Sequence, residues 1–116
     1  MKTVEFTGRT SAMRTNTPWL ASEDLMGLGP VKVTIEGVYH HDEAIFDAGR
    51  KEKNVFSVKF AGKEKQLVLN STNRRRLVAL FDTTDVTKWK GKEVTLVVSE
   101  TKLMGQTVPC IRVKVD

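Results

Sequence analysis

The sequence predicts an all-β fold in which five short strands roll into a closed barrel that carries one helix. Five segments alternate apolar and polar residues with a period of two, which is typical of strands with one buried face. Between the third and fourth of them, Leu77, Leu80 and Phe81 fall at spacings of three and four, which is typical of an amphipathic helix. An open sheet with the helix packed on one face is the alternative.

Each element has its own local signal. The helix is expected to begin at Ser71 or Thr72, which can cap its first turn, and to end near Phe81. Phe56 and Phe60 follow the apolar period of the second strand, so both are expected in the core. The expected strands cover residues 31–36, 54–60, 65–69, 93–99 and 108–115.

The order of these elements is strand, strand, strand, helix, strand, strand. This is the order of the oligonucleotide/oligosaccharide-binding fold, or OB-fold. Closing the sheet would bury the apolar faces of all five strands in one core, and the helix would plug one open end. Trp89 is expected against a barrel end, and Trp19 is expected to cover the bottom of the barrel or the helix.

A chain of 116 residues suits one domain. Residues 1–17 are rich in Thr, Ser and Arg without a sustained period, so they are expected to form an N-terminal arm that is mobile unless something fixes it, and residues 18–116 a single OB-like domain. No apolar run approaches the ~20 residues that a membrane span needs. The absence of an apolar signal segment and the single cysteine, Cys110, favour a cytoplasmic protein.

Positive charge is concentrated in the second half of the chain. Residues 1–49 carry 4 basic and 7 acidic side chains, whereas residues 50–116 carry 15 basic and 7 acidic ones. A basic region of this kind attracts polyanions such as nucleic acid. An ordinary lysine-rich soluble surface is the alternative interpretation.

An OB barrel places its ligand across strands two and three, between the loops that join strands one to two and four to five. These loops are expected at residues 40–53 and 100–107. Cations would neutralise phosphates, and aromatic rings would stack on bases, at about 1–3 kcal/mol per base. Tyr39 and Phe46 are the candidate stacking rings, with strand-end packing and pinning of the long loop as their respective alternatives. The candidate nucleic-acid-binding residues are Tyr39, Phe46, Arg50, Lys51, Lys53, Lys59, Lys102, Arg112 and Lys114.

Catalytic and metal-binding motifs are absent from the sequence. The run His40 to Glu43 is a poor chelate, because adjacent side chains of an extended segment point to opposite sides. Asp82 and Asp85 are interpreted as turn and cap residues rather than an acid–base pair. We therefore expect no enzyme activity, no catalytic residues, no metal and no cofactor.

Four short motifs resemble a family of small proteins encoded by tailed phages and prophages: EDL at residues 23–25, LVLNSTN at 67–73, WKGKEVTL at 89–96 and CIRVKV at 110–115. The resemblance implies an OB-like fold, a place in phage DNA replication or recombination, and single-stranded DNA as ligand. It also implies the cytoplasm of the host bacterium as location. The chain lacks the disordered acidic tail of bacterial single-strand-binding proteins, so recruitment of repair enzymes through such a tail is not expected.

These observations together predict a non-catalytic, sequence-tolerant protein that binds single-stranded DNA. The alternative is an OB-fold protein-interaction or phage structural module that does not bind nucleic acid. Partners are expected among phage or host replication and recombination proteins, and the edge of the first or the fourth strand offers a route to a homo-oligomer.

Overall fold

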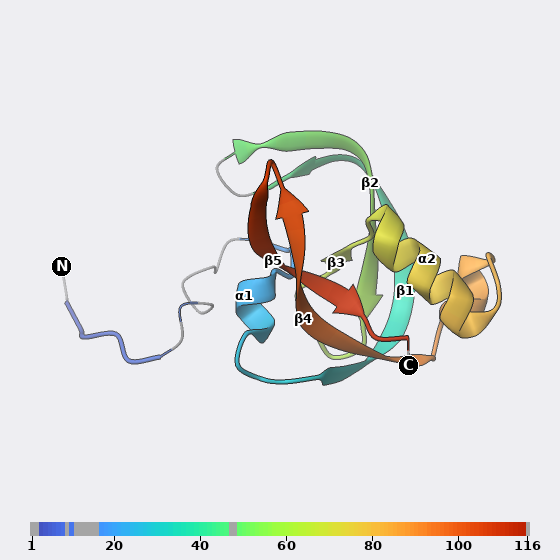
Figure 1. Ribbon diagram of the computed structural model, residues 1–116, viewed down its shortest axis with the longest axis horizontal. Helices are drawn as coiled ribbons and strands as arrows, with labels where there is room; N and C mark the ends of the chain where they lie inside the picture. Colours follow the sequence, from blue (N-terminus) through green and yellow to red (C-terminus); the bar gives the residue numbers. More distant parts are fainter. Residues whose placement is uncertain (1–2, 9, 11–16, 47–48, 116) are drawn as a thin grey trace.

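The computed structural model describes residues 3–8, 10, 17–46 and 49–115. Its strands form one antiparallel sheet in the order β3-β2-β1-β4-β5 (Figure 1). The expected arm at residues 1–17 lies largely outside the described residues, and its described residues 3–8 are exposed. In chain order the elements are α1 (Ser22–Leu25), β1 (Val31–Ile45), β2 (Lys51–Phe60), β3 (Leu67–Val68), α2 (Ser71–Phe81), the 3-10 helix η3 (Val86–Trp89), β4 (Glu93–Leu103) and β5 (Gln106–Val113).

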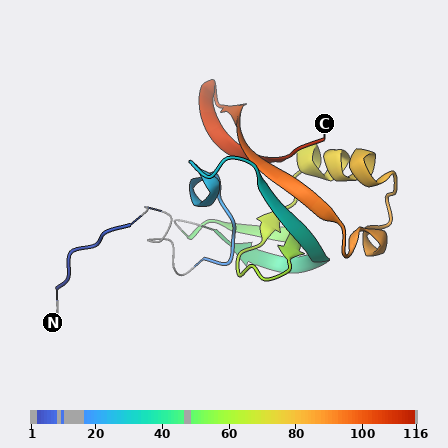
Figure 2. The same ribbon diagram turned by 90° about the horizontal axis from the view of Figure 1, so that it is seen from below.

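Strand β1 joins the two halves of the sheet. Its first residues, Val31 to Thr34, pair with β4, and the stretch from Ile35 to Ile45 pairs with β2. The register with β2 shifts between Ile35 and Gly37, where a β-bulge bends the strand. As a result the β4–β5 hairpin rises away from the layer formed by β1, β2 and β3 (Figure 2).

The prediction of a closed barrel is wrong, because the sheet stays open. Strand β3 pairs with β2 and β5 pairs with β4, but among the described residues β3 and β5 do not pair with each other. The element order also differs from the expected one, since α1 precedes β1 and η3 follows α2. In a closed barrel β3 and β5 would pair with each other. Two sets of hydrogen bonds to other parts of the chain occupy these two edges instead.

The first set lies beside β3. Trp19 forms a parallel bridge with Gln66, just before β3 begins. The backbone N–H of Leu20 donates to Gln66 O at 2.8 Å, and the N–H of Gln66 donates to Pro18 O at 2.8 Å. The segment that precedes α1 therefore takes the place beside Gln66 that β5 would take in a barrel.

The second set lies beside β5. There the side-chain amide of Asn73 offers one donor and one acceptor to the backbone of β5, as the peptide group of a neighbouring strand would. Its Nδ2 donates to Ile111 O at 2.9 Å, and its Oδ1 accepts from the N–H of Val113 at 3.0 Å. Asn73 is fully buried, so both bonds are sheltered from water. Arg76 Nη1 donates to Val113 O at 2.9 Å. Helix α2 therefore covers the edge of β5 with side-chain groups instead of a strand.

Helix α2 lies where its sequence predicts and ends at Phe81 as expected, but the expectation that Ser71 or Thr72 caps it is wrong, because both residues lie inside the first turn. The side chain of Asn70 accepts from the N–H of Asn73 at 2.9 Å and caps the first turn. The helix ends at Asp82, whose φ of 54° is left-handed. Asn73 and Leu77 are one turn apart, so they share the face that packs inward, and both are buried.

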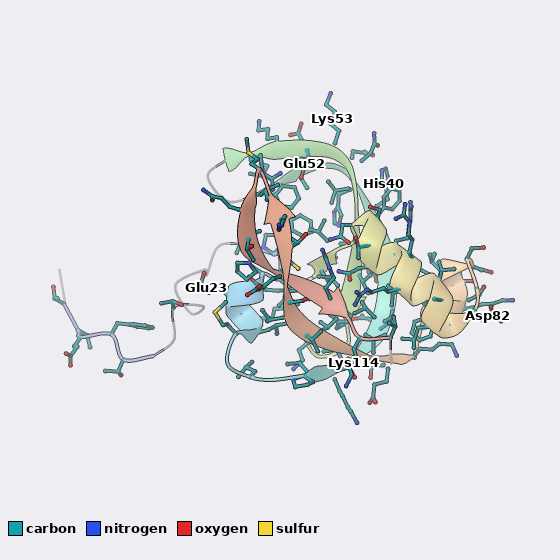
Figure 3. All side chains as sticks on the ribbon, in the orientation of Figure 1. Glu23, His40, Glu52, Lys53, Asp82 and Lys114 are labelled. Carbon is teal, nitrogen blue, oxygen red and sulfur yellow. The ribbon has the colours of Figure 1, made fainter. Side chains whose placement is uncertain are left out.

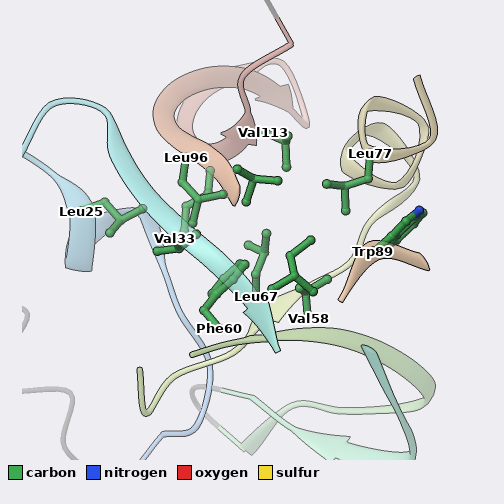
Figure 4. Packing of buried hydrophobic residues seen from close by; sticks show 12 residues of the cluster. Leu25, Val33, Val58, Phe60, Leu67, Leu77, Trp89, Leu96 and Val113 are labelled. Atoms are coloured by element: carbon green, nitrogen blue, oxygen red, sulfur yellow. The ribbon is translucent and has the colours of Figure 1, made fainter. Parts of the chain in front are cut away.

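The main core lies between the two halves of the sheet and α2 (Figure 4). Trp89 is buried there, and its Nε1 donates to Thr83 O at 3.2 Å, which fixes η3 against the end of α2. Phe60 is buried as expected, but the expectation for Phe56 is wrong, because 48% of it is exposed and its ring pairs with His40 at 4.8 Å. The cluster consists of Leu25, Val33, Ile35, Val58, Phe60, Leu67, Leu77, Trp89, Val94, Leu96, Ile111 and Val113.

Both expected ligand-flanking loops are mostly strand. Strand β1 continues to Ile45 and β2 begins at Lys51, so most of the expected loop at 40–53 forms a long hairpin. Likewise β4 continues to Leu103 and β5 begins at Gln106. Beyond the main core most side chains of these strands are exposed, so period-two alternation is lost there. This explains why the sequence pattern marked the strands as shorter than they are.

Asn73→Ala tests the importance of the amide contact between α2 and β5. The substitution leaves Ile111 O and the N–H of Val113 buried without their partner, so we expect a loss of about 2–4 kcal/mol in the free energy of unfolding. Urea denaturation measures this loss. Asn70→Ala is the matched control, because it removes an N-cap and should cost only about 1 kcal/mol. Equal losses for the two variants would contradict the role given to Asn73.

Candidate nucleic-acid interface

The nine residues predicted to bind nucleic acid fall in three separate regions of the sheet. Lys53 and Lys114, which belong to two different regions, lie on opposite sides of the molecule, at the top and the bottom of Figure 3. The end of the β1–β2 hairpin carries Phe46, Arg50, Lys51 and Lys53; the middle of β1 and β2 carries Tyr39 and Lys59; and β4 and β5 with the residue after β5 carry Lys102, Arg112 and Lys114.

At the end of the β1–β2 hairpin, Phe46 is already engaged by its neighbours. The guanidinium of Arg50 lies 4.8 Å from the centre of its ring, and the ring of Trp19 lies 5.3 Å away. The N–H of Phe46 also donates to Arg50 O at 2.7 Å, which closes the turn. These contacts pin the turn to the sheet.

Two of the three cations of this hairpin, Arg50 and Lys53, face carboxylates. Arg50 Nη1 lies 3.2 Å from Glu52 Oε2. Lys53 is opposite Glu43 in the register of β1 and β2, at a distance where opposite charges attract. Lys51 is opposite Ile45. The net positive charge at this end of the sheet is therefore smaller than the count of Lys and Arg suggests.

Trp19 covers the β1–β2 face between His41 and Phe46, so the expectation that it covers the barrel bottom or the helix is wrong. Its ring meets that of His41 edge-on at 5.1 Å, and its Nε1 donates to Ile45 O at 2.9 Å. Trp19 is buried, with Ala44 and Val55 in the same small cluster. The segment before α1 thus lies across the face that an OB barrel would offer to its ligand.

A chain of hydrogen bonds continues under this cover. Ser57 Oγ donates to Gln66 Oε1 at 2.6 Å, which uses its only hydrogen. His41 Nε2 lies 2.8 Å from the same hydroxyl and must therefore be the donor, which assigns the proton to Nε2. Ser57 is fully buried and satisfied on both sides, so this polar group stabilises the sheet.

Tyr39 is the candidate stacking residue whose ring has an open face. It is 44% exposed and folds over Gly37, where an added Cβ would lie 3.2 Å from Tyr39 Oη. Lys59 is opposite Gly37 in the register, and its Nζ lies 3.9 Å from Glu36 Oε2. A ring and a partly paired cation are thus close together on this part of the face.

A group of cations lies on the outer side of β1, β4 and β5. Lys32 pairs with Thr95, and the N–H of Lys114 donates to the carbonyl of the same threonine, so the three residues form one row across three strands. At a strand spacing of about 4.8 Å, the Cα atoms of Lys32 and Lys114 lie about 10 Å apart. Arg112 points to the same side, because Ile111 and Val113 on either side of it are buried. We call Lys32, Arg112 and Lys114 the outer cationic face.

Lys32 was absent from the predicted set, although its outward position follows from the alternation of Val31, Lys32 and Val33. What the sequence did not indicate is that β1 lies next to β4, which brings Lys32 beside Lys114. Arg76 adjoins this face through its bond to Val113 O, and Glu93 flanks it on β4.

The residues considered for catalysis or metal binding have structural contacts. Asp85 accepts from the N–H and the hydroxyl of Thr87 at 3.0 Å and 2.6 Å and caps η3. Asp82 ends α2. His40 Nε2 lies 3.2 Å from Asn54 Oδ1. Within the described residues, no cluster of three His, Cys, Asp or Glu side chains is arranged to hold a metal ion.

The cap at η3 predicts a dependence of stability on pH. The hydroxyl of Thr87, its backbone N–H and nearby Lys88 hold the pKa of the Asp85 carboxyl below its ordinary value. A group with a lowered folded-state pKa stabilises the protein above its unfolded-state pKa, and loses that contribution as the pH falls through the folded-state pKa. Asp85→Asn should therefore be less stable than the parent at neutral pH. In thermal unfolding, the difference between the melting temperatures of the two proteins should shrink as the pH is lowered into the acid range. A difference that is constant with pH would contradict this account.

No family model matches the chain, and no curated protein or solved structure matches it at a significant level. The resemblance to phage proteins therefore stays a prediction that rests on the short motifs. Among the described residues, no helix is both long and apolar enough to cross a membrane.

Proposed function

We propose that this protein binds single-stranded DNA without catalysis, and that the phosphate backbone lies along the outer cationic face. The observation that carries the proposal is the position of Lys32, Arg112 and Lys114 on one side of three neighbouring strands. Neutralisation of phosphates by such cations releases counterions and gives affinity that does not depend on sequence.

The side chains between these cations suit a flexible strand. Thr95 lies between Lys32 and Lys114, and Val97 is opposite Arg112, so no carboxylate separates the three charges. The same face of β1 continues past the bulge to Gly37 and Tyr39. The half-exposed ring of Tyr39 offers one base a stacking surface beside Lys59.

The motif resemblance supports placing this activity in phage DNA replication or recombination, in the cytoplasm of a host bacterium. The cap positions of Asp82 at the end of α2 and of Asp85 at the start of η3 support a role without a chemical step.

A protein-interaction role is the second candidate. It is favoured by the tip of the β4–β5 hairpin, where 61% of Leu103 and 96% of Met104 are exposed. Apolar side chains gathered at such a protruding point often mark a contact with another protein.

The salt dependence of oligo-dT binding, followed by fluorescence anisotropy, tests the DNA proposal. The parent protein should bind at low salt, and the logarithm of its affinity should fall linearly with that of the salt concentration. Lys114→Ala and Lys32→Ala should each reduce the slope by about 0.7, the value for one phosphate contact on a single strand. Tyr39→Leu should weaken binding by about 1–3 kcal/mol and leave the slope unchanged, because stacking releases no counterions.

Lys63→Ala is the matched control, since it removes the same charge from an exposed turn between β2 and β3. It should leave the slope as in the parent. If the folded parent fails to bind oligo-dT at low salt, the proposal is wrong. If Lys63→Ala reduces the slope as much as Lys114→Ala does, binding is not localised to the outer cationic face.

A further inference from the structure

We propose that this chain forms a symmetric dimer by pairing the open edge of β4 with the same edge of a second copy. The two strands run antiparallel about a twofold axis that passes through Thr101. This inference stands on the geometry of the β4–β5 hairpin and does not depend on DNA binding.

The edge is open because β1 and β5 cover different lengths of β4. Strand β1 pairs with β4 only between Glu93 and Leu96, whereas β5 accompanies β4 to Leu103. Beyond Leu96 no described strand lies on the side of β4 that faces away from β5, and the hairpin projects past the start of β1 (Figure 2). An exposed strand edge is a template for pairing with another chain.

The alternation of hydrogen bonds identifies the backbone groups on that edge. Lys114 N–H bonds to Thr95 O, so Thr95 and every second residue after it direct their N–H and C=O groups toward β5. The intervening residues Val98, Glu100 and Lys102 direct theirs to the open side. None of the described residues makes a backbone hydrogen bond to these groups there.

The charges on this edge are complementary to themselves. With the axis at Thr101, Glu100 is opposite Lys102 of the second copy, and Lys102 is opposite its Glu100. Both residues direct their backbone groups outward, so each such pair exchanges two N–H···O bonds and brings opposite charges together. Moving the axis to Glu100 or to Lys102 would instead place like charges opposite each other, which is unfavourable.

Within the β4–β5 hairpin, neither Glu100 nor Lys102 has an oppositely charged residue across from it on β5. Lys102 is opposite Thr107, and Glu100 is opposite Pro109. Both side chains are exposed. The chain therefore carries two exposed charges of opposite sign, two residues apart on one face of an open edge.

A hydrophobic contact falls in the same register. This register brings Met104, in the turn that follows β4, near Val98 of the second copy, and 96% of Met104 is exposed. Val98 borders a hollow of about 420 Å³, lined also by Leu25, Pro30 and Val97. An unbranched thioether side chain adapts to irregular apolar gaps of this kind. The twofold axis makes the contact twice.

Charge reversal tests the register by sedimentation equilibrium on nuclease-treated protein, which removes association through DNA. The parent should sediment as a dimer. Glu100→Lys and Lys102→Glu alone should each place like charges in both pairs and raise the dimer dissociation constant about tenfold or more. The double variant E100K/K102E recreates both ion pairs with reversed polarity and should restore the dimer.

Lys90→Glu is the matched control, because it makes the same charge change in an exposed turn away from the β4 edge, and it should remain dimeric. A parent that stays monomeric at its highest soluble concentration would overturn the proposal. So would a double variant that dimerises no better than the single ones.

A crosslink gives a second readout that leaves the charges intact. In Thr101→Cys combined with Cys110→Ser, the new thiol lies on the axis, opposite its copy, so mild oxidation should give a disulfide-linked dimer on a non-reducing gel. Thr107→Cys with Cys110→Ser places the thiol on β5, one strand away from the new interface, and should remain monomeric on the gel. Equal crosslinking of the two variants would contradict the proposed register.

Discussion

The side-chain amide of Asn73 is the contact on which the rest of this structure depends. It presents one donor and one acceptor to β5, as a neighbouring strand would, and it does so from the first turn of a helix. Because the amide is fully buried, α2 has little freedom to slide or turn. Leu77, one turn further along the same face, is thereby placed in the core with Val58 and Val113 (Figure 4).

This contact also explains why the sheet stays open. A barrel would need β5 to pair with β3, but the edge of β5 at Ile111 and Val113 is satisfied by Asn73 and Arg76. The other edge is satisfied by the chain before α1, through the bridge between Trp19 and Gln66. Buried backbone groups need partners, but side chains and irregular segments supply them as well as strands do. The backbone groups that a closed barrel would have paired are thus hydrogen-bonded although the sheet stays open.

The open sheet determines which surfaces are free to bind. Trp19 lies across the β1–β2 face, so the region where an OB barrel would take its ligand is partly covered. In the row of cations, Lys32 and Lys114 are exposed. The far part of β4 lacks a neighbouring strand among the described residues. The proposed DNA contact lies where β1, β4 and β5 are neighbours, whereas the proposed dimer edge lies where the hairpin extends beyond β1.

The sequence by itself determined the local elements of this protein. Helix α2 lies close to its expected position because its caps, Asn70 and Asp82, act through contacts within a few residues, and the burial of Phe60 follows from the apolar period of its strand. Only the tertiary structure decided the partners of the strand edges, the exposure of Phe56 and the position of Trp19, because each depends on residues distant in sequence. Period-two alternation specifies which side of a strand is apolar, but it contains no information about which strand, helix or loop lies beside it. For the same reason Lys32 became a member of the candidate interface only when β1 was found next to β4.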